Sequence, residues 1–183
     1  MNSGTKASFV IGAIGGFIIA LLRIPGNLGW TEAADAYQLH FQILILALIL
    51  ISIGFFGLWR KSGNVILLVS AIFIILMDIT RPLLTYLVTY TLLLPVGFDP
   101  AVFYGIGYIF GGVGWIVAGI AAWLLREEFS QFSMVAALVF VAFGASTFLA
   151  LLIGSGGIGG WWYWFQLANG IVTGIYFLDA ART

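Results

Sequence analysis

The feature that most constrains this chain is a set of long apolar runs that are almost free of charge. One of them, Phe41–Leu58, contains no charged side chain. Only 8% of all residues are charged, whereas a soluble domain carries about 25%. A chain with so little charge cannot cover a surface that faces water. We therefore expect the lipid bilayer to be its solvent and its first partner.

The continuity of these runs predicts helices rather than strands. Inside a bilayer the backbone must pair its polar groups within the protein, so only helices and closed barrels cross it. A barrel would show segments of about ten residues in which apolar and polar side chains alternate. The runs here are longer and do not alternate. The sequence predicts an all-α, polytopic bundle of transmembrane helices that forms a single domain over residues 1–183.

Turn residues between the apolar runs divide the chain into six predicted spans, and a bilayer requires about 20 residues for each. The last span begins with an aromatic group at Trp161 and ends near Leu178. The other five are predicted at Ser8–Leu22, Thr31–Trp59, Val65–Arg81, Val102–Leu125 and Ser133–Ile153.

The stretch Leu83–Leu94 allows two topologies. It follows Pro82, which lacks the N–H that a helix needs and tends to end it, and we interpret it as a broken extension of the third span at the outer interface. The alternative is a short additional span, which gives seven spans in a three-plus-one-plus-three plan. Every later span would then point the other way.

Positive charges favour six spans, because Lys and Arg accumulate in the cytoplasmic segments. With six spans and the N-terminus inside, the outer end carries Arg23, and also Arg81 if that side chain reaches the interface. The cytoplasmic end then carries Lys6, Arg60, Lys61, Arg126 and Arg182. Seven spans remove this bias. We expect a multi-pass protein of the cell membrane with both termini in the cytoplasm.

Similar landmarks in residues 1–98 and 99–183 raise the hypothesis of an internal three-helix repeat. Ile14–Arg23 resembles Val117–Arg126, and Ser52–Trp59 resembles Ser155–Trp162, both at an offset of 103 residues. Three-span halves would be inverted relative to each other, as in many transporters whose sites lie between the repeats. Membrane segments draw on few residue types, however, so chance similarity is the simpler explanation.

Two groups of polar residues within the apolar runs are candidate sites for a substrate or a gate. Asp78 and Arg81 are three residues apart, so on a helix they can pair, and intramembrane ionisable residues are functional candidates by default. A structural ion pair that fixes a kink at Pro82 is the competing interpretation. Gln166, Asn169 and Thr173 share one helix face, where they either line a polar path or hold helices together through hydrogen bonds.

Several classes of function lack the residues they need. The sequence has no cysteine and a single histidine, His40, so we expect no thiolate or multi-histidine metal site and no bis-histidine haem. Neither a G-x-S-x-G nor a P-loop motif is present. Because the net charge is zero, nucleic acid is not an expected partner. The sequence predicts no enzyme, no catalytic residue and no cofactor.

Two functions remain open from the sequence. The first is a small transporter or channel for a polar solute or a proton, with Asp78 and Arg81 as the binding or gating pair. The second is a non-catalytic membrane subunit or scaffold. Its glycine-rich helix faces would pack against a second copy or against other membrane proteins, since small residues let helices approach closely.

Overall fold

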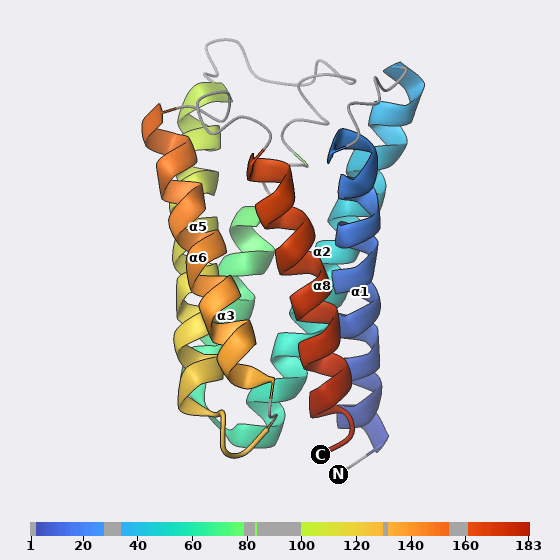
Figure 1. Ribbon diagram of the computed structural model, residues 1–183, viewed down its shortest axis with the longest axis vertical. Helices are drawn as coiled ribbons and strands as arrows, with labels where there is room; N and C mark the ends of the chain where they lie inside the picture. The colour runs from blue at the N-terminus through green and yellow to red at the C-terminus, as the bar shows by residue number, and fades with distance from the viewer. Residues whose placement is uncertain (1–2, 28–33, 79–82, 84–99, 130–131, 154–160) are drawn as a thin grey trace.

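The computed structural model describes residues 3–27, 34–78, 83, 100–129, 132–153 and 161–183 (Figure 1). Their regular secondary structure is entirely helical, which confirms the predicted all-α fold. The helices are α1 (Ser3–Asn27), α2 (Ala34–Ser62), α3 (Val65–Phe73) with its π-helical continuation η1 (Ile74–Asp78), α5 (Pro100–Leu124), α6 (Ser133–Ile153) and α8 (Trp161–Ala180).

Four of these helices are long and apolar enough to cross a membrane, judged by length and composition. The spanning parts are Ser3–Ile24 of α1, Gln42–Ser62 of α2, Gly105–Leu124 of α5 and Ser133–Ile153 of α6. The chain is thus a multi-pass helical membrane protein. Among the described residues, α3 is apolar but shorter and α8 is not in this group, so six spans remain a prediction.

The helices form a closed ring in chain order. Each packs mainly against the helices before and after it, and α8 completes the ring by packing against α1. Neighbouring helices run in opposite directions, so the two chain ends lie at the same end of the bundle (Figure 1). We call this the terminal end.

Glycines allow several neighbouring helices of the ring to approach each other closely. A Cβ added to Gly12 would lie 2.7 Å from Gly54 Cα of α2. One added to Gly16 would lie 2.6 Å from Gly174 N of α8, and one at Gly144 would lie 2.6 Å from Gly112 O of α5. Lipid tails are as apolar as leucine, so such close packing is a main source of helix association in a membrane.

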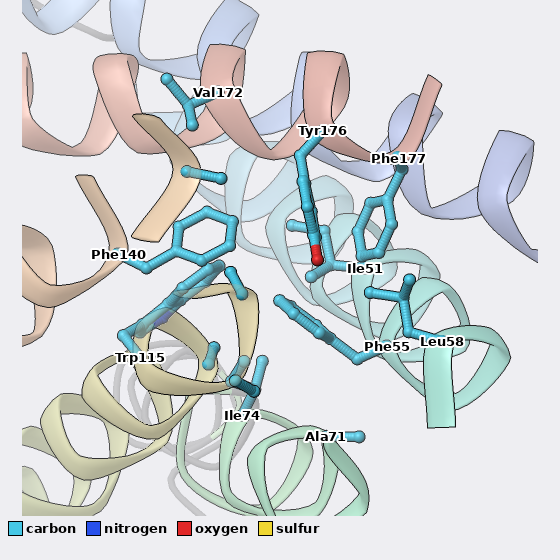
Figure 2. Close-up of a cluster of buried hydrophobic side chains, with 14 of the residues drawn as sticks. Ile51, Phe55, Leu58, Ala71, Ile74, Trp115, Phe140, Val172, Tyr176 and Phe177 are labelled. Atoms are coloured by element: carbon cyan, nitrogen blue, oxygen red, sulfur yellow. The ribbon is translucent and has the colours of Figure 1, made fainter. Parts of the chain in front are cut away.

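A cluster of aromatic side chains fills the interior of the ring (Figure 2). Phe55 of α2 lies at its centre, with ring centroids 5.1 Å from Phe177 and 6.1 Å from Trp115. Phe140 of α6 lies 5.3 Å from Trp115 and 5.9 Å from Tyr176. Most of these pairs meet edge to face, an arrangement that aromatic rings favour beyond simple burial. The cluster joins α2, α5, α6 and α8.

The terminal end of the bundle gathers the cations that the sequence assigned to the cytoplasm. Lys6 lies in the first turn of α1 and Arg182 directly after α8, while Arg60 and Lys61 end α2 and Arg126 follows α5. Lys61 Nζ lies 3.4 Å from Thr183 Oγ1 and 4.8 Å from the centre of the Phe129 ring. The charge bias therefore coincides with one physical end of the molecule.

The hypothesis of an internal three-helix repeat stays a prediction. The segment Ser52–Trp59 lies inside α2, whereas residues 155–160 are outside the described residues and Trp161 begins α8. Ile14–Arg23 lies in α1, and Val117–Arg126 begins in α5 and ends just after it.

Candidate functional site

The pair Asp78 and Arg81 lies at the edge of what the structure describes. Asp78 is the last residue of η1, but its side chain and the whole of Arg81 are outside the described residues. Their predicted pairing therefore stays a prediction. The sequence did not reveal the π-helix itself, because it carries no residue signature. Such segments occur frequently at functional sites.

The three polar residues of α8 lie on one buried face, as their spacing predicts. The exposed fraction is 4% for Gln166, 2% for Asn169 and 0% for Thr173. At 1.5 Å per residue, Asn169 lies roughly 12 Å along a helix of roughly 30 Å. These side chains therefore lie in the interior of the bundle and near the middle of its height.

Two of these side chains are left with an unsatisfied oxygen. Thr173 is satisfied within its own helix, since its Oγ1 donates to Asn169 O at 2.7 Å. Gln166 Oε1 and Asn169 Oδ1 accept no hydrogen bond from any described residue. A buried oxygen without a donor costs about 1–3 kcal/mol. Water or a bound polar group would remove that cost.

The same face of α8 continues toward the terminal end with Tyr176. Its hydroxyl is buried and lies beside that of Ser133, the first residue of α6. Neither hydroxyl makes a hydrogen bond of normal geometry with a described residue. We call Gln166, Asn169, Thr173, Tyr176 and Ser133 the α8 polar row. Sequence reasoning missed the last two, although Tyr176 follows Thr173 by three residues and so shares its face.

Aromatic rings surround the part of the α8 polar row that lies toward the terminal end. The Tyr176 ring has its centroid 5.9 Å from that of Phe140 and 5.8 Å from that of Phe177, and Figure 2 shows the hydroxyl pointing into the cluster. A solute larger than water that follows the row must displace these rings. The arrangement thus places two buried amides at mid-height and closely packed aromatic rings next to them, toward the terminal end.

His40, the single histidine, contacts the guanidinium of Arg23. Its Nε2 lies 3.4 Å from Arg23 Nη1, a contact that links α2 to α1. Among the described residues, no three His, Cys, Asp or Glu side chains are grouped closely enough to hold a metal ion. Glu32 and Asp35, which the sequence places near His40, have side chains outside the described set.

The chain was compared with protein-family models, curated proteins and solved structures, and none of them matches it.

Proposed function

We propose that this protein is a small transporter or channel for a polar solute or for protons, and that the α8 polar row is its binding path. One observation carries the proposal: Gln166 and Asn169 hold unpartnered amide oxygens at mid-height inside a membrane-embedded bundle. No residue is assigned a catalytic step.

In a protein that binds nothing, these buried amides would only lower the stability of the fold. Leucine at either position would fill a comparable space without an unsatisfied oxygen, whereas the amide costs about 1–3 kcal/mol when it stays unpaired. Interhelical hydrogen bonds would offset that cost, but these oxygens form none with the described residues. A polar species that enters the row supplies the missing donors, which supports a binding role.

The proposal also includes the six-span topology and the gating pair. With the terminal end in the cytoplasm, the five cations gathered there obey the positive-inside rule. Asp78 ends the π-helical segment, and we place the gate there, with Arg81 as its partner. Asp78→Asn should reduce flux while the protein still folds and purifies as the wild type does.

The scaffold hypothesis is the less supported of the two. It rests on glycine faces that are free to receive a partner helix. Gly12, Gly16, Gly112 and Gly144 are instead covered by α2, α8, α6 and α5 of the same chain. They hold the ring together and leave no exposed glycine groove at these positions.

Flux measurements in proteoliposomes test the proposal. The wild type should dissipate an imposed proton gradient, or release a trapped small polar solute, faster than empty vesicles. Asn169→Leu and Gln166→Leu should each lower the rate about tenfold, the change produced by about 1.4 kcal/mol at a barrier.

Ser146→Ala is the matched control. Ser146 is as buried as the two amides, but its Oγ donates to Phe143 O within α6 at 2.7 Å. This variant should keep the wild-type rate. Equal rates for wild type, Asn169→Leu and empty vesicles, across protons and a panel of small polar solutes, would remove the transport function.

A further inference from the structure

A groove at the terminal end of the bundle combines apolar walls with two charged side chains. It has a volume of about 440 Å³ and is lined by Phe132, Ile175, Leu178, Asp179 and Arg182. It lies where α8 ends and where the connection from α5 enters α6. Because this end carries the cations expected near headgroups, the groove lies at the height of the membrane interface.

The apolar wall of the groove continues along the outside of α8. Ile171, Ile175 and Leu178 are spaced by four and three residues, and each has between 37% and 39% of its surface exposed. Arg182 follows at the same spacing and ends the stripe. A lipid chain can lie along these side chains while its headgroup stays beside Arg182.

The charged rim contains both signs. The Arg182 side chain is exposed and makes no hydrogen bond or ion pair with any described residue. Asp179 Oδ2 accepts from Phe132 N at 3.4 Å, and a carboxylate has further lone pairs for other donors. A ligand that offers an anion to Arg182 and a hydrogen-bonding cation to Asp179 would match both charges of the rim.

We propose that this groove binds a phospholipid with a phosphoethanolamine headgroup. The phosphate would contact the Arg182 guanidinium, a favoured pairing for phosphate oxygens. The primary ammonium would donate to the Asp179 carboxylate, and one acyl chain would lie along Ile175 and Ile171. This binding site does not depend on the transport function proposed above.

A second groove has no charged side chain in its lining and serves as a comparison. It has a volume of about 330 Å³ and lies between α5 and α6, lined only by apolar side chains that include Trp123, Leu138 and Val141. The nearby Arg126 is occupied, because its guanidinium stacks 5.1 Å from the Trp123 ring and pairs with Glu127 at 3.4 Å. We expect this groove to accept an acyl chain of any phospholipid.

The test compares three lipids with identical acyl chains bound to the purified protein in detergent. Phosphatidylethanolamine, phosphatidylcholine and phosphatidylglycerol are added separately, and bound lipid is counted by native mass spectrometry. Choline has no N–H to donate and glycerol has no cation. Phosphatidylethanolamine should therefore bind about threefold more tightly, as expected of one partly exposed ionic contact. Equal binding of all three lipids by the wild type would overturn the proposal.

Variants separate the two contacts. Asp179→Asn keeps an acceptor for Phe132 N but removes the charge, so ethanolamine binding should fall to the choline level. Arg182→Gln should weaken all three lipids, whereas Arg126→Gln should weaken none. An unchanged ethanolamine preference in Asp179→Asn would exclude the ammonium contact. Soluble phosphoethanolamine should not compete at matched concentration, and if it does, the acyl-chain contact is wrong.

Discussion

In the α8 polar row, a single residue can lower the stability of the fold and at the same time favour binding. The buried amide of Asn169 is unfavourable for stability and, under our proposal, favourable for binding. Asn169→Leu should therefore raise the midpoint of thermal unfolding in detergent by a few degrees, because it removes about 1–3 kcal/mol of penalty. The same variant should lose flux. A lower midpoint with unchanged flux would show that the amide has a structural partner.

Glycine positions give a second prediction at the scale of single residues. A Cβ at Gly16 meets backbone atoms of α8 at 2.6 and 2.8 Å, whereas one at Gly105 meets, among the described residues, only Leu151 Cδ1 at 3.7 Å. Gly16→Ala should destabilise the protein by about 1–3 kcal/mol, as overpacking does. Gly105→Ala should be neutral or slightly stabilising in the same thermal assay, since alanine favours helix. Equal midpoints for the two variants would contradict the close contact of α1 with α8.

At this scale, the sequence predicts which residues share a helix face better than it predicts which residues that face contacts. The three-and-four spacing placed Gln166, Asn169 and Thr173 on one face, and the structure confirms that this face is buried. It did not identify Tyr176 and Ser133, since an aromatic residue and a helix-start serine look like ordinary packing. Which polar atoms remain unpaired depends on the neighbouring helices, and no local pattern contains that information.

At the scale of elements, local chemistry explains where α3 begins. Gly63 has φ of 70°, a left-handed conformation that glycine tolerates, and its N–H donates to Trp59 O at 2.7 Å. Asn64 then caps α3, since its Oδ1 accepts from Ile66 N at 2.9 Å. The tight turn between α2 and α3 follows directly from the Ser-Gly-Asn sequence.

The cap of α3 gives the third prediction. Asn64→Ala should cost about 1 kcal/mol, the usual cost of losing an N-cap acceptor. Asn64→Asp keeps the acceptor and should retain most of the stability. Thermal unfolding of the wild type and the two variants in one detergent measures both effects. If Asn64→Asp unfolded at the same temperature as Asn64→Ala, the side-chain contact to Ile66 N would not matter for stability.

Helix positions were largely predictable, but helix regularity was not. The predicted fifth span, Ser133–Ile153, has the same bounds as α6, and the predicted fourth differs from α5 by one or two residues at each end. Apolar runs bounded by turn residues are sufficient to predict where these helices begin and end. The change from α3 to η1 within one apolar run has no such boundary, because both helix types accept the same side chains.

At the scale of the whole molecule, the ring makes the topology testable with few probes. The sequence contains no cysteine, so each introduced cysteine is the only reactive thiol. Cysteines placed singly at Lys61 and Glu127 should be labelled from the same side of the membrane by an impermeant maleimide, because both positions lie at the terminal end. Labelling from opposite sides would favour seven spans.

For the described helices, the sequence predicts the alternating directions but not the order around the ring. Charge counting pointed to alternating helices with both termini at one end, and the structure has that arrangement (Figure 1). The choice of neighbours depends on how small residues of distant helices match, as Gly16 matches Gly170 and Gly174. Those glycines are more than a hundred residues apart, so no sequence window contains the match.

The closure of the ring has a consequence for synthesis. A ribosome delivers α1 to the membrane first and α8 last, yet the atoms nearest to the groove at Gly16 belong to α8. Until α8 is synthesised, this groove must therefore be covered by lipid or bound to an insertion factor. A chain interrupted before Trp161 would offer the groove to any other small-residue helix and should be removed rapidly by membrane proteases.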